Sequence, residues 1–165
     1  MNIAATKNLT KQLTNPSNFD FIMDTMMSVM ENKIKYESKT TFTDVQITKK
    51  YLLTRFRLRK NETFACLFLN NKNRLIKFEE LFHGTINKTN VYPRIIAQKA
   101  LELNAGAVIF AHNHPSGNIE PSTSDKIITS RLIQTMELID VRVLDHVIVG
   151  HSKTFSMAEH GMMDN

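Results

Sequence analysis

Residues 107–125 have the sequence AVIFAHNHPSGNIEPSTSD, and they carry the clearest signals of the fold. It opens with Ala107–Ala111, an uninterrupted apolar run whose length and composition predict a strand buried on both faces. The Pro-Ser-Gly sequence that follows predicts a turn. Ser122, which comes after a proline and before apolar residues at helical spacing, predicts the start of a helix. A buried strand that leads through a turn into a helix is typical of domains in which helices cover a sheet.

Elements on both sides of this stretch complete a domain. Thr43 is a residue type that caps helices, and Tyr51, Leu52 and Phe56 recur after it at helical spacing. Before the quoted stretch, the predicted elements are a helix from Thr43 to about Lys60, a hairpin of two strands (Thr63–Asn70 and Arg74–Gly84) and a helix from Pro93 to near Gly106. The strand Ala107–Ala111 follows, and then a helix after Ser122 whose buried stripe consists of Ile128, Leu132, Met136 and Ile139. The last predicted element is a strand from Val143 to Gly150. This order predicts an α/β or α+β domain with helices packed on a mixed sheet.

The N-terminal part of the chain differs from the rest in composition. Residues 1–18 are polar and predict a loose arm. Between Phe19 and Ile34 the apolar residues recur at steps of three and four, which predicts an amphipathic helix with a stripe of Met23, Met26, Met27 and Met30. Such a stripe is typical of core packing or of contact with a second copy of the chain. We therefore expect an N-terminal arm and helix over residues 1–42 and one globular domain over residues 43–165.

The overall composition predicts a folded cytoplasmic protein. Charged residues make up 22% of the chain and hydrophobic residues 42%, which is typical of globular domains and excludes a disordered chain. The single cysteine, Cys66, excludes an internal disulfide and a thiolate zinc cluster. The N-terminus lacks the apolar core of a signal peptide, and no run approaches the roughly 18 apolar residues of a membrane helix. We expect a protein that is neither exported nor anchored to a membrane.

Basic residues are concentrated in one segment. The formal net charge is +5, and six basic side chains fall within residues 49–60. They are Lys49, Lys50, Arg55, Arg57, Arg59 and Lys60. Such a cluster can attract a nucleic acid or another acidic surface. The alternative is the solvated face of a helix, which we favour because apolar residues interleave with the basic ones at helical spacing.

Two histidines and an aspartate follow the buried strand. His112 and His114, two residues apart on an extended chain, point to the same side, so both rings can converge on one ion. The turn and the helix start can bring Asp125 back as a third ligand, which completes a set of two nitrogens and one oxygen that zinc accepts at catalytic sites. Three protein ligands leave a fourth position for water, whose pKa zinc lowers to about 7. We therefore predict a hydrolytic site with one Zn²⁺ per chain.

Each part of this pattern also has a simpler interpretation. A hydrolytic site needs a donor for the developing oxyanion, and Ser122 is placed to supply it. However, Ser-x-x-Asp before a periodic apolar run is also a capping box, in which Ser122 and Asp125 only satisfy amides at the helix start. A His-x-His pair by itself is as compatible with chance as with metal binding. The combination of strand, His-x-His, turn and Ser-x-x-Asp, in that order, favours the metal site.

The spacing of His112, His114, Ser122 and Asp125 matches the JAMM motif of the MPN (JAB) metallopeptidase superfamily. The surrounding sequence resembles the RadC branch of that superfamily. The similarity covers roughly Thr43 to Met163 and is carried by ELFHGTI (80–86), VYPR (91–94), AHNHPSG (111–117) and VLDHVIVG (143–150). The resemblance implies an MPN/JAB fold, similar to that of cytidine deaminases, with a mixed sheet and a zinc-dependent activity that cleaves a peptide or isopeptide bond in a protein or peptide substrate.

The resemblance also implies roles for single residues. It makes His112, His114 and Asp125 the zinc ligands and Ser122 the oxyanion donor. The family carries an upstream glutamate as general acid and base, and Glu62 matches that position because it follows the first domain helix. Glu79 and Glu80 in the second hairpin strand are the competitors.

The other polar residues of these motifs carry less specific expectations. Asn113 stands where deubiquitinating members of the superfamily have Ser or Thr, but the RadC branch commonly has Asn there. Asp145 and His146 belong to the branch motif, and we expect them to give structural support or to contact a ligand from behind. His83 is expected to be a half-exposed strand residue, and His151 and His160 are expected at the surface.

The sequence leaves three functions to compare. The first is the metallohydrolase. The second is a DNA-associated accessory protein linked to DNA repair, but the helix-hairpin-helix segment of longer RadC proteins has no match in residues 1–42, and the basic cluster lacks stacking aromatics. The third is a non-catalytic scaffold, which ranks last because such members of the superfamily usually lack the ligands. A zinc deaminase is disfavoured because its Pro-Cys-x-x-Cys ligands are absent.

Overall fold

The computed structural model describes residues 44–84 and 90–163, together with Asn18, Ile22, Thr25, Val29 and Phe42. The chain divides into two compact units, Met1–Lys39 and Thr40–Asn165. In the first unit, Ile22, Thr25 and Val29 are helical. The four methionines of the predicted stripe lie outside the described residues, so their role stays a prediction.

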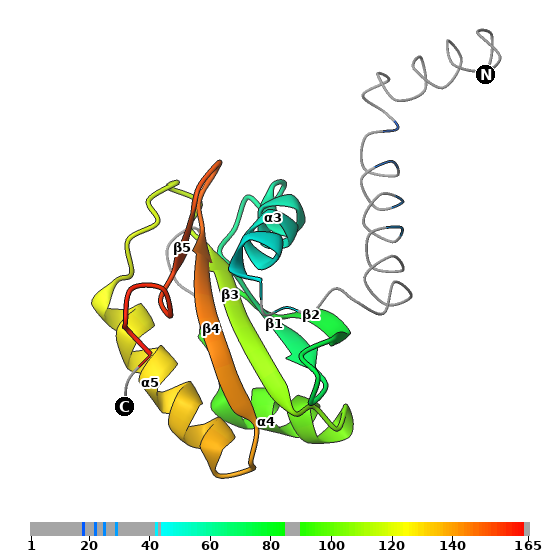
Figure 1. The fold of residues 1–165 in the computed structure, drawn as a ribbon. Coiled ribbons are helices and arrows are strands. Elements are labelled where there is room, and N and C mark those ends of the chain that lie inside the picture. Colours follow the sequence, from blue (N-terminus) through cyan, green and yellow to red (C-terminus); the bar gives the residue numbers. More distant parts are fainter. Residues whose placement is uncertain are drawn as a thin grey trace, which may run out of the picture. The chain divides into compact units, whose positions relative to one another are not determined.

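The second unit is built on a five-stranded mixed sheet (Figure 1). The strands lie in the order β2-β1-β3-β4-β5. Their bounds are Thr63–Leu69 for β1, Leu75–His83 for β2, Ala107–Asn113 for β3, Arg142–Val149 for β4 and Thr154–Ser156 for β5. β3 and β4 are parallel, whereas the other neighbouring pairs are antiparallel. The predicted hairpin is therefore β1–β2, and β3 lies at the centre.

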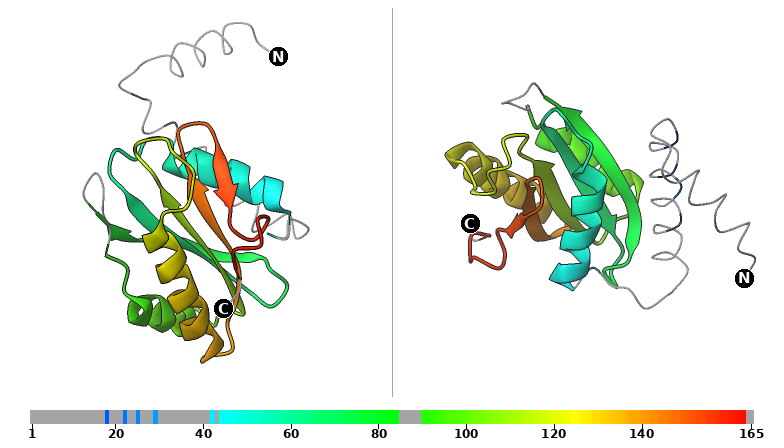
Figure 2. Two further views of the ribbon diagram at one scale, coloured as in Figure 1. Left: turned by 90° about the vertical axis from the view of Figure 1, so that its left-hand side faces the viewer. Right: turned by 90° about the horizontal axis from the view of Figure 1, so that it is seen from above.

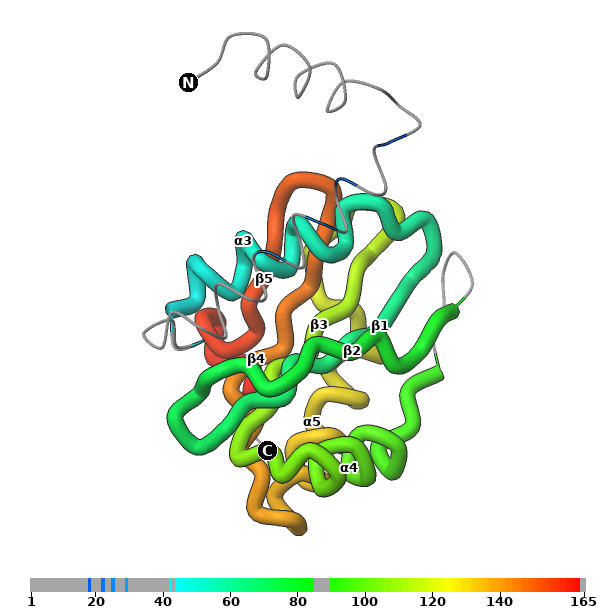
Figure 3. Tube along the Cα trace, turned by 90° about the vertical axis from the view of Figure 1, so that its right-hand side faces the viewer, coloured from blue at the N-terminus to red at the C-terminus, as the bar shows by residue number. Residues whose placement is uncertain are grey.

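Helices cover both faces of this sheet (Figures 2 and 3). They are α3 (Val45–Phe56), α4 (Pro93–Glu102) and α5 (Thr123–Glu137). α3 lies on one face, and α4 and α5 lie together on the other (Figure 3). In the described part of the chain, none of the helices has both the length and the apolar composition that a bilayer crossing requires. The predicted α/β domain with helices packed on a mixed sheet is confirmed.

The two central strands are buried on both faces, which explains their unbroken apolar sequences. Every residue of β1 and of β3 is buried. On one face, alternate residues of these strands, Phe64, Cys66, Phe68, Val108 and Phe110, form a core with Ile96, Ala100, Leu132 and Met136 from α4 and α5. Burial raises the pKa of the Cys66 thiol, so this cysteine behaves as a small apolar residue.

The other face of the sheet packs against α3. Tyr51, Leu52 and Phe56 of α3 are buried, as the helical spacing predicts. The rings of Tyr51 and Phe56 meet the edge of Phe78 on β2, with centroid distances of 5.8 and 6.3 Å. Residues 49–56 therefore form a helix that buries its apolar residues, whereas residues 57–60 lie beyond the helix.

The two ends of α3 differ from the prediction. The cap of α3 is Asp44, whose carboxylate accepts hydrogen bonds from the N–H groups of Gln46 and Ile47, while Thr43 lies outside the described residues. The helix ends at Phe56 and not near Lys60, because Phe56 is the last apolar residue that the core receives and Leu58 is already 45% exposed. Strand β5 was not predicted, because a strand of three residues is too short to show a period.

Glycines allow the loop after β3 to pack closely on the β4–β5 turn. The N–H of His114 donates to the carbonyl oxygen of Val149 at 2.9 Å, which ties the loop to the end of β4. Gly117 has a φ of +80°, and a Cβ atom there would lie 2.5 Å from the ring of His151. A Cβ atom at Gly150 would lie 2.7 Å from the carbonyl oxygen of Gly117. The loop that follows the two histidines therefore has little freedom to move.

We predict that Gly117→Ala destabilises the protein more than Gly161→Ala does. Both glycines have positive φ, which costs a residue with a Cβ atom roughly 1–2 kcal/mol. Only at Gly117 does the new Cβ atom also meet a side chain, the ring of His151, which must turn away to make room and so adds to the cost. Urea unfolding of the two variants measures the difference. Equal losses in the free energy of unfolding would show that the contact with His151 adds nothing to the cost of the substitution.

Candidate metal centre

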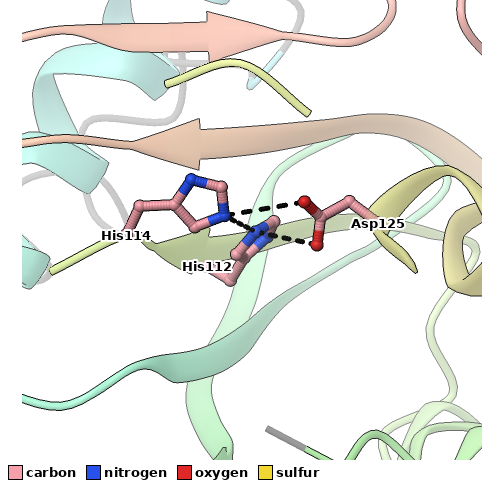
Figure 4. A group of neighbouring side chains, drawn as sticks. All are labelled: His112, His114 and Asp125. Atoms are coloured by element: carbon pink, nitrogen blue, oxygen red, sulfur yellow. Dashed lines mark hydrogen bonds and ion pairs between the residues drawn. The ribbon is translucent and has the colours of Figure 1, made fainter. Parts of the chain in front are cut away.

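Three side chains from separate elements meet at the end of β3 (Figure 4). His112 belongs to β3, His114 follows the strand directly, and Asp125 lies in the first turn of α5. The two histidine Nε2 atoms are 2.9 Å apart. Asp125 Oδ1 lies 3.2 Å from Nε2 of His112, and Oδ2 lies 3.6 Å from Nε2 of His114. One potential ligand atom from each residue falls within 4.8 Å of the others.

The convergence of His112 and His114 follows from the strand geometry. Residues two apart in a strand point to the same face, and β3 continues far enough to include His112 and Asn113. His114 is held further by its Nδ1 atom, which lies 2.7 Å from the carbonyl oxygen of Asn118. A carbonyl oxygen only accepts, so Nδ1 carries a proton, and Nε2 of the neutral ring presents a lone pair to the cluster. Two imidazole nitrogens and a carboxylate form a donor set that fits zinc.

Interactions within the cluster shift the pKa of Asp125 down and the pKa of His114 up. Burial alone would raise the pKa of Asp125, but in the form in which His112 and His114 carry protons on Nε2, their hydrogen bonds to this carboxylate outweigh burial and hold its pKa well below the ordinary value. In the same form, the hydrogen bond to Asp125 raises the pKa of His114. The carboxylate is therefore ionised at neutral pH, and it presents a negative charge at the point where the imidazoles meet.

Asp125 serves the helix and the cluster together. Its Oδ2 atom accepts from the N–H of Ser122 at 2.8 Å and from the Ser122 hydroxyl at 2.6 Å, while Ser122 Oγ accepts from the N–H of Asp125 at 3.1 Å. This is the capping box that the sequence offered as the simpler interpretation. The capping box and the cluster are compatible, because Oδ1 of Asp125 remains directed at His112. The role of Ser122 as oxyanion donor stays a prediction.

A cleft of about 840 Å³ opens over the cluster. All five predicted site residues line it: His112, His114, Ser122, Asp125 and Glu62. Its other walls come from residues 90–93 at the start of α4 and from residues of α5. The volume lies in the range of ligand-binding sites.

The strand register separates Glu62 from its competitors. Phe64 pairs with His112 in the antiparallel β1–β3 ladder, so continuing this register places Glu62 opposite His114 on the same face of the sheet. Glu80 pairs with Ala65, whose side chain points to the opposite face, and its carboxylate accepts from Arg59 at 2.8 Å.

Glu79 shares the face of the cluster but lies away from the cleft. It pairs with Cys66, further along β1, and its carboxylate contacts Lys77 at 3.1 Å and Lys99 of α4 at 3.6 Å. Neither Glu79 nor Glu80 lines the cleft, whereas Glu62 does. This geometry supports the choice of Glu62, although its catalytic role stays a prediction.

Asn113, for which no role was predicted from the sequence, holds the segment that carries Glu62. The side chain of Asn113 is buried, and its Oδ1 atom accepts from the N–H of Thr63 at 2.8 Å. Its Nδ2 atom donates to the carbonyl oxygen of Asn61 at 3.1 Å. The carbonyl oxygen of Glu62 itself accepts from Gly84 at 2.9 Å. Asn113 thus ties Asn61 and Thr63, the two neighbours of Glu62, to β3.

Of the remaining polar residues, Asp145 holds the backbone near β5, His146 contacts His112, and three histidines are exposed. The buried carboxylate of Asp145 accepts from the N–H groups of His146 and Ala158 and from the Ser156 hydroxyl, so it links β4 to the chain around β5. His146 lies behind the cluster, with Nε2 2.8 Å from Nδ1 of His112. The three other histidines, His83, His151 and His160, are exposed and do not line the cleft.

Comparison with known proteins now adds to this geometry. The family described as "RadC-like JAB domain" matches residues 42–162. The chain belongs to the RadC family. Within this family, a "UPF0758 protein" of Nitrosococcus oceani is 53% identical over 121 residues, which cover 73% of this chain and 54% of that relative. A "UPF0758 protein" of Xylella fastidiosa is 54% identical over 114 residues, covering 69% and 51% of the two chains.

Relatives of the RadC family differ in length. The chain spans about half the length of the first two relatives. In contrast, its match to "UPF0758 protein YeeS" of Escherichia coli K12, 47% identical over 128 residues, covers 78% of this chain and 86% of the relative. The resemblance to RadC seen in the motifs is confirmed, and the sheet with its helices is consistent with a JAB domain. The names of these relatives state no activity.

We predict that Asp125→Ala weakens zinc binding by more than about 100-fold, because even residues behind the ligands change metal affinity 10–100-fold. Competition against a chromogenic chelator measures the affinity. Ser122→Ala is the matched control, since it removes the cap hydroxyl at a cost of about 1 kcal/mol but leaves the three ligand side chains in place. Equal affinities of Asp125→Ala and Ser122→Ala would exclude Asp125 as a ligand.

Proposed function

We propose that the protein is a JAMM-type zinc hydrolase that cleaves a peptide or isopeptide bond. The observation that carries the proposal is the meeting of His112, His114 and Asp125 in a cleft that Glu62 also lines. Membership of a JAB-domain family supports a hydrolase without naming the bond. The cleft supplies what hydrolysis of an amide needs: a place for a Lewis acid, a proton acceptor and a hydroxyl donor.

His112, His114 and Asp125 would hold the metal through Nε2, Nε2 and a carboxylate oxygen. When bound, zinc supplies Lewis acidity and makes hydroxide available near neutral pH. The ionised Asp125 also reduces the net charge that the bound metal would bring into the cleft. Asn118 and His146 hold the rings of the two histidines from behind.

Glu62 and Ser122 would move protons and stabilise charge. The carboxylate of Glu62 accepts a proton from the attacking water and later gives it to the nitrogen of the leaving amine, as the C–N bond breaks. The hydroxyl of Ser122 donates to the carbonyl oxygen while negative charge develops there. That hydroxyl donates to Asp125 in the structure, so it must turn toward the substrate. Asn113 positions Glu62 through the backbone on either side of it.

The alternative is a DNA-associated protein, and the structure weakens its main support. Three of the six basic side chains of residues 49–60 are engaged within the domain. Lys49 forms an ion pair with Glu159, Arg59 pairs with Glu80, and Arg55 lies 4.2 Å from the ring centroid of Phe78. Lys50, Arg57 and Lys60 remain exposed. Salt-dependent association with DNA that persists in variants of the metal site would favour this alternative.

We predict about one zinc per chain, and a loss of 10²–10⁴-fold in kcat for Glu62→Gln with zinc content unchanged, because a positioned acid and base contributes about this factor. Elemental analysis measures the metal, and a library of peptides and isopeptide-linked conjugates measures cleavage. Glu80→Gln is the matched control, since it changes a glutamate of β2 that does not line the cleft.

Two results would contradict this proposal. If the wild type binds no zinc after incubation with the metal, the site is not a metal centre, and the capping box accounts for Ser122 and Asp125. If Glu80→Gln loses activity while Glu62→Gln keeps it, the general base is assigned to the wrong strand.

The cleft also suggests which substrates it prefers. Arg131 is exposed and lines the cleft, on the same side of α5 as Asp125 and Ile128. Its guanidinium forms no ion pair with any residue in the described part of the chain. Because a helix rises 1.5 Å per residue, Arg131 lies roughly 9 Å along α5 from Asp125, a span of two to three extended residues. An acidic group at that distance from the cleaved bond would meet this cation.

We predict that Arg131→Glu lowers kcat/KM for substrates with an acidic residue at this distance by about tenfold or more, which corresponds to about 1.4 kcal/mol. Substrates with a basic residue there should gain. The control Lys126→Glu makes the same charge change on α5 outside the cleft lining. The same change in preference for both variants would show that net charge, and not Arg131, controls the choice.

A further inference from the structure

A fully buried histidine lies behind His112 and uses both of its ring nitrogens. His146, on β4, has no exposed surface. Its Nε2 atom lies 2.8 Å from Nδ1 of His112, and its Nδ1 atom lies 2.6 Å from Oγ1 of Thr129 on α5. The rings of Phe64 and Phe110 meet that of His146 edge-on, with centroids 5.5 and 6.1 Å away. The ring is therefore held in one orientation.

Thr129 determines which atom is the donor in each of these hydrogen bonds. Its hydroxyl oxygen lies 2.6 Å from the backbone carbonyl oxygen of Asp125. Two oxygens at this distance need a proton between them, and a carbonyl oxygen only accepts, so the single hydroxyl proton of Thr129 points to Asp125. Oγ1 of Thr129 must then accept from His146, which means that Nδ1 of His146 carries a proton.

The hydrogen-bond direction at Thr129 also sets the directions at His146 and His112. His146 is fully buried, and its two ring nitrogens contact a hydroxyl oxygen and another imidazole, neither of which balances a positive charge, so the ring is neutral and has a single N–H. That proton is on Nδ1, so Nε2 accepts from Nδ1 of His112. The neutral ring of His112 then has its lone pair on Nε2, the atom that faces His114 and Asp125.

We propose that Thr129 and His146 are positioning residues that fix His112 in the tautomer with a free Nε2 lone pair, and so prepare it to bind a metal. This inference rests on the metal site of the proposed function but not on hydrolysis. The chain of contacts runs from the carbonyl oxygen of Asp125 through Thr129 and His146 to His112. The Thr129 hydroxyl therefore binds the backbone carbonyl of one ligand, Asp125, and determines the tautomer of another, His112.

The two histidine ligands differ in how their tautomers are set. His114 donates directly to the carbonyl oxygen of Asn118, which can act in one direction only. His112 donates to a histidine, which can accept or donate, so its tautomer depends on what lies beyond. Removing the Thr129 hydroxyl is thus expected to release His112 but not His114.

Thr129→Val tests this proposal, because it keeps the shape of the side chain and removes the hydroxyl. We expect zinc affinity, measured by chelator competition, to fall 10–100-fold. Thr129→Ser, which keeps the hydroxyl, should bind zinc like the wild type. The matched control is Thr135→Val, which removes a hydroxyl with the same type of bond on α5, to the carbonyl oxygen of Arg131 at 2.8 Å, but with no histidine partner.

The tautomers themselves are measurable without metal. Long-range ¹H–¹⁵N spectra of the metal-free protein, at a fixed pH well above the ordinary histidine pKa of about 6.5, report which ring nitrogen carries the proton. We expect Nδ1–H for His112, His114 and His146 in the wild type, and a mixture for His112 alone in Thr129→Val.

Four outcomes would decide against parts of this scheme, in which Thr129 and His146 relay a hydrogen-bond direction to His112 (the relay). A proton on Nε2 of His112 in the wild type overturns the relay, as does wild-type zinc affinity in Thr129→Val. Equal weakening by Thr135→Val overturns it too, because the loss is then a general effect on α5. Absence of zinc binding by the wild type overturns the proposed metal site instead, and the spectra still decide the relay.

Discussion

Strand β3 is paired along both edges and packed on both faces, and the rest of the site depends on this constraint. Because β1 and β4 fix its register and α3, α4 and α5 cover it, its last residues cannot shift without disturbing the core. His112 therefore leaves the sheet at a defined point. Glu62, just before β1, continues the register to a place opposite His114, and His146 on β4 pairs with Phe110, two residues before His112. The pairing of β3 with its two neighbours thus controls where the ligand, the predicted base and the residue behind the ligand lie.

The cluster also shows how one group can satisfy local and functional demands together. Asp125 completes the capping box of α5 with one oxygen and faces His112 with the other. Asn113 points away from the cluster and holds the backbone around Glu62. In both cases the structural contact restrains a side chain that the proposed chemistry needs, and such restraint lowers the cost of ordering the site when a substrate or a metal binds.

Charge is distributed unevenly between the cleft and the outer surface. Near the cluster, Asp125 and Glu62 are acidic, and Arg131 is the cationic side chain among the described residues that line the cleft. The basic segment 49–60 belongs to α3 and the chain after it, on the opposite face of the sheet, and half of its cations contact residues of the domain. The excess of positive charge is therefore not concentrated at the cleft, and it does not by itself identify a partner.

Elements whose signals are local could be predicted from the sequence. The apolar run of β3, the two-residue spacing of His112 and His114, and the Ser122–Asp125 helix start each depend on residues close in the chain, so period and capping rules suffice to predict them. The catalytic role of Glu62 stays a prediction. The tertiary structure was needed to show that Glu62 lines the cleft and Glu80 does not, because the faces of the sheet are set by pairing partners far apart in sequence. Asn113, Thr129 and His146 were given no defined role, or only an open one, for the same reason. Their hydrogen bonds join separate strands and a helix, and no local pattern encodes such contacts.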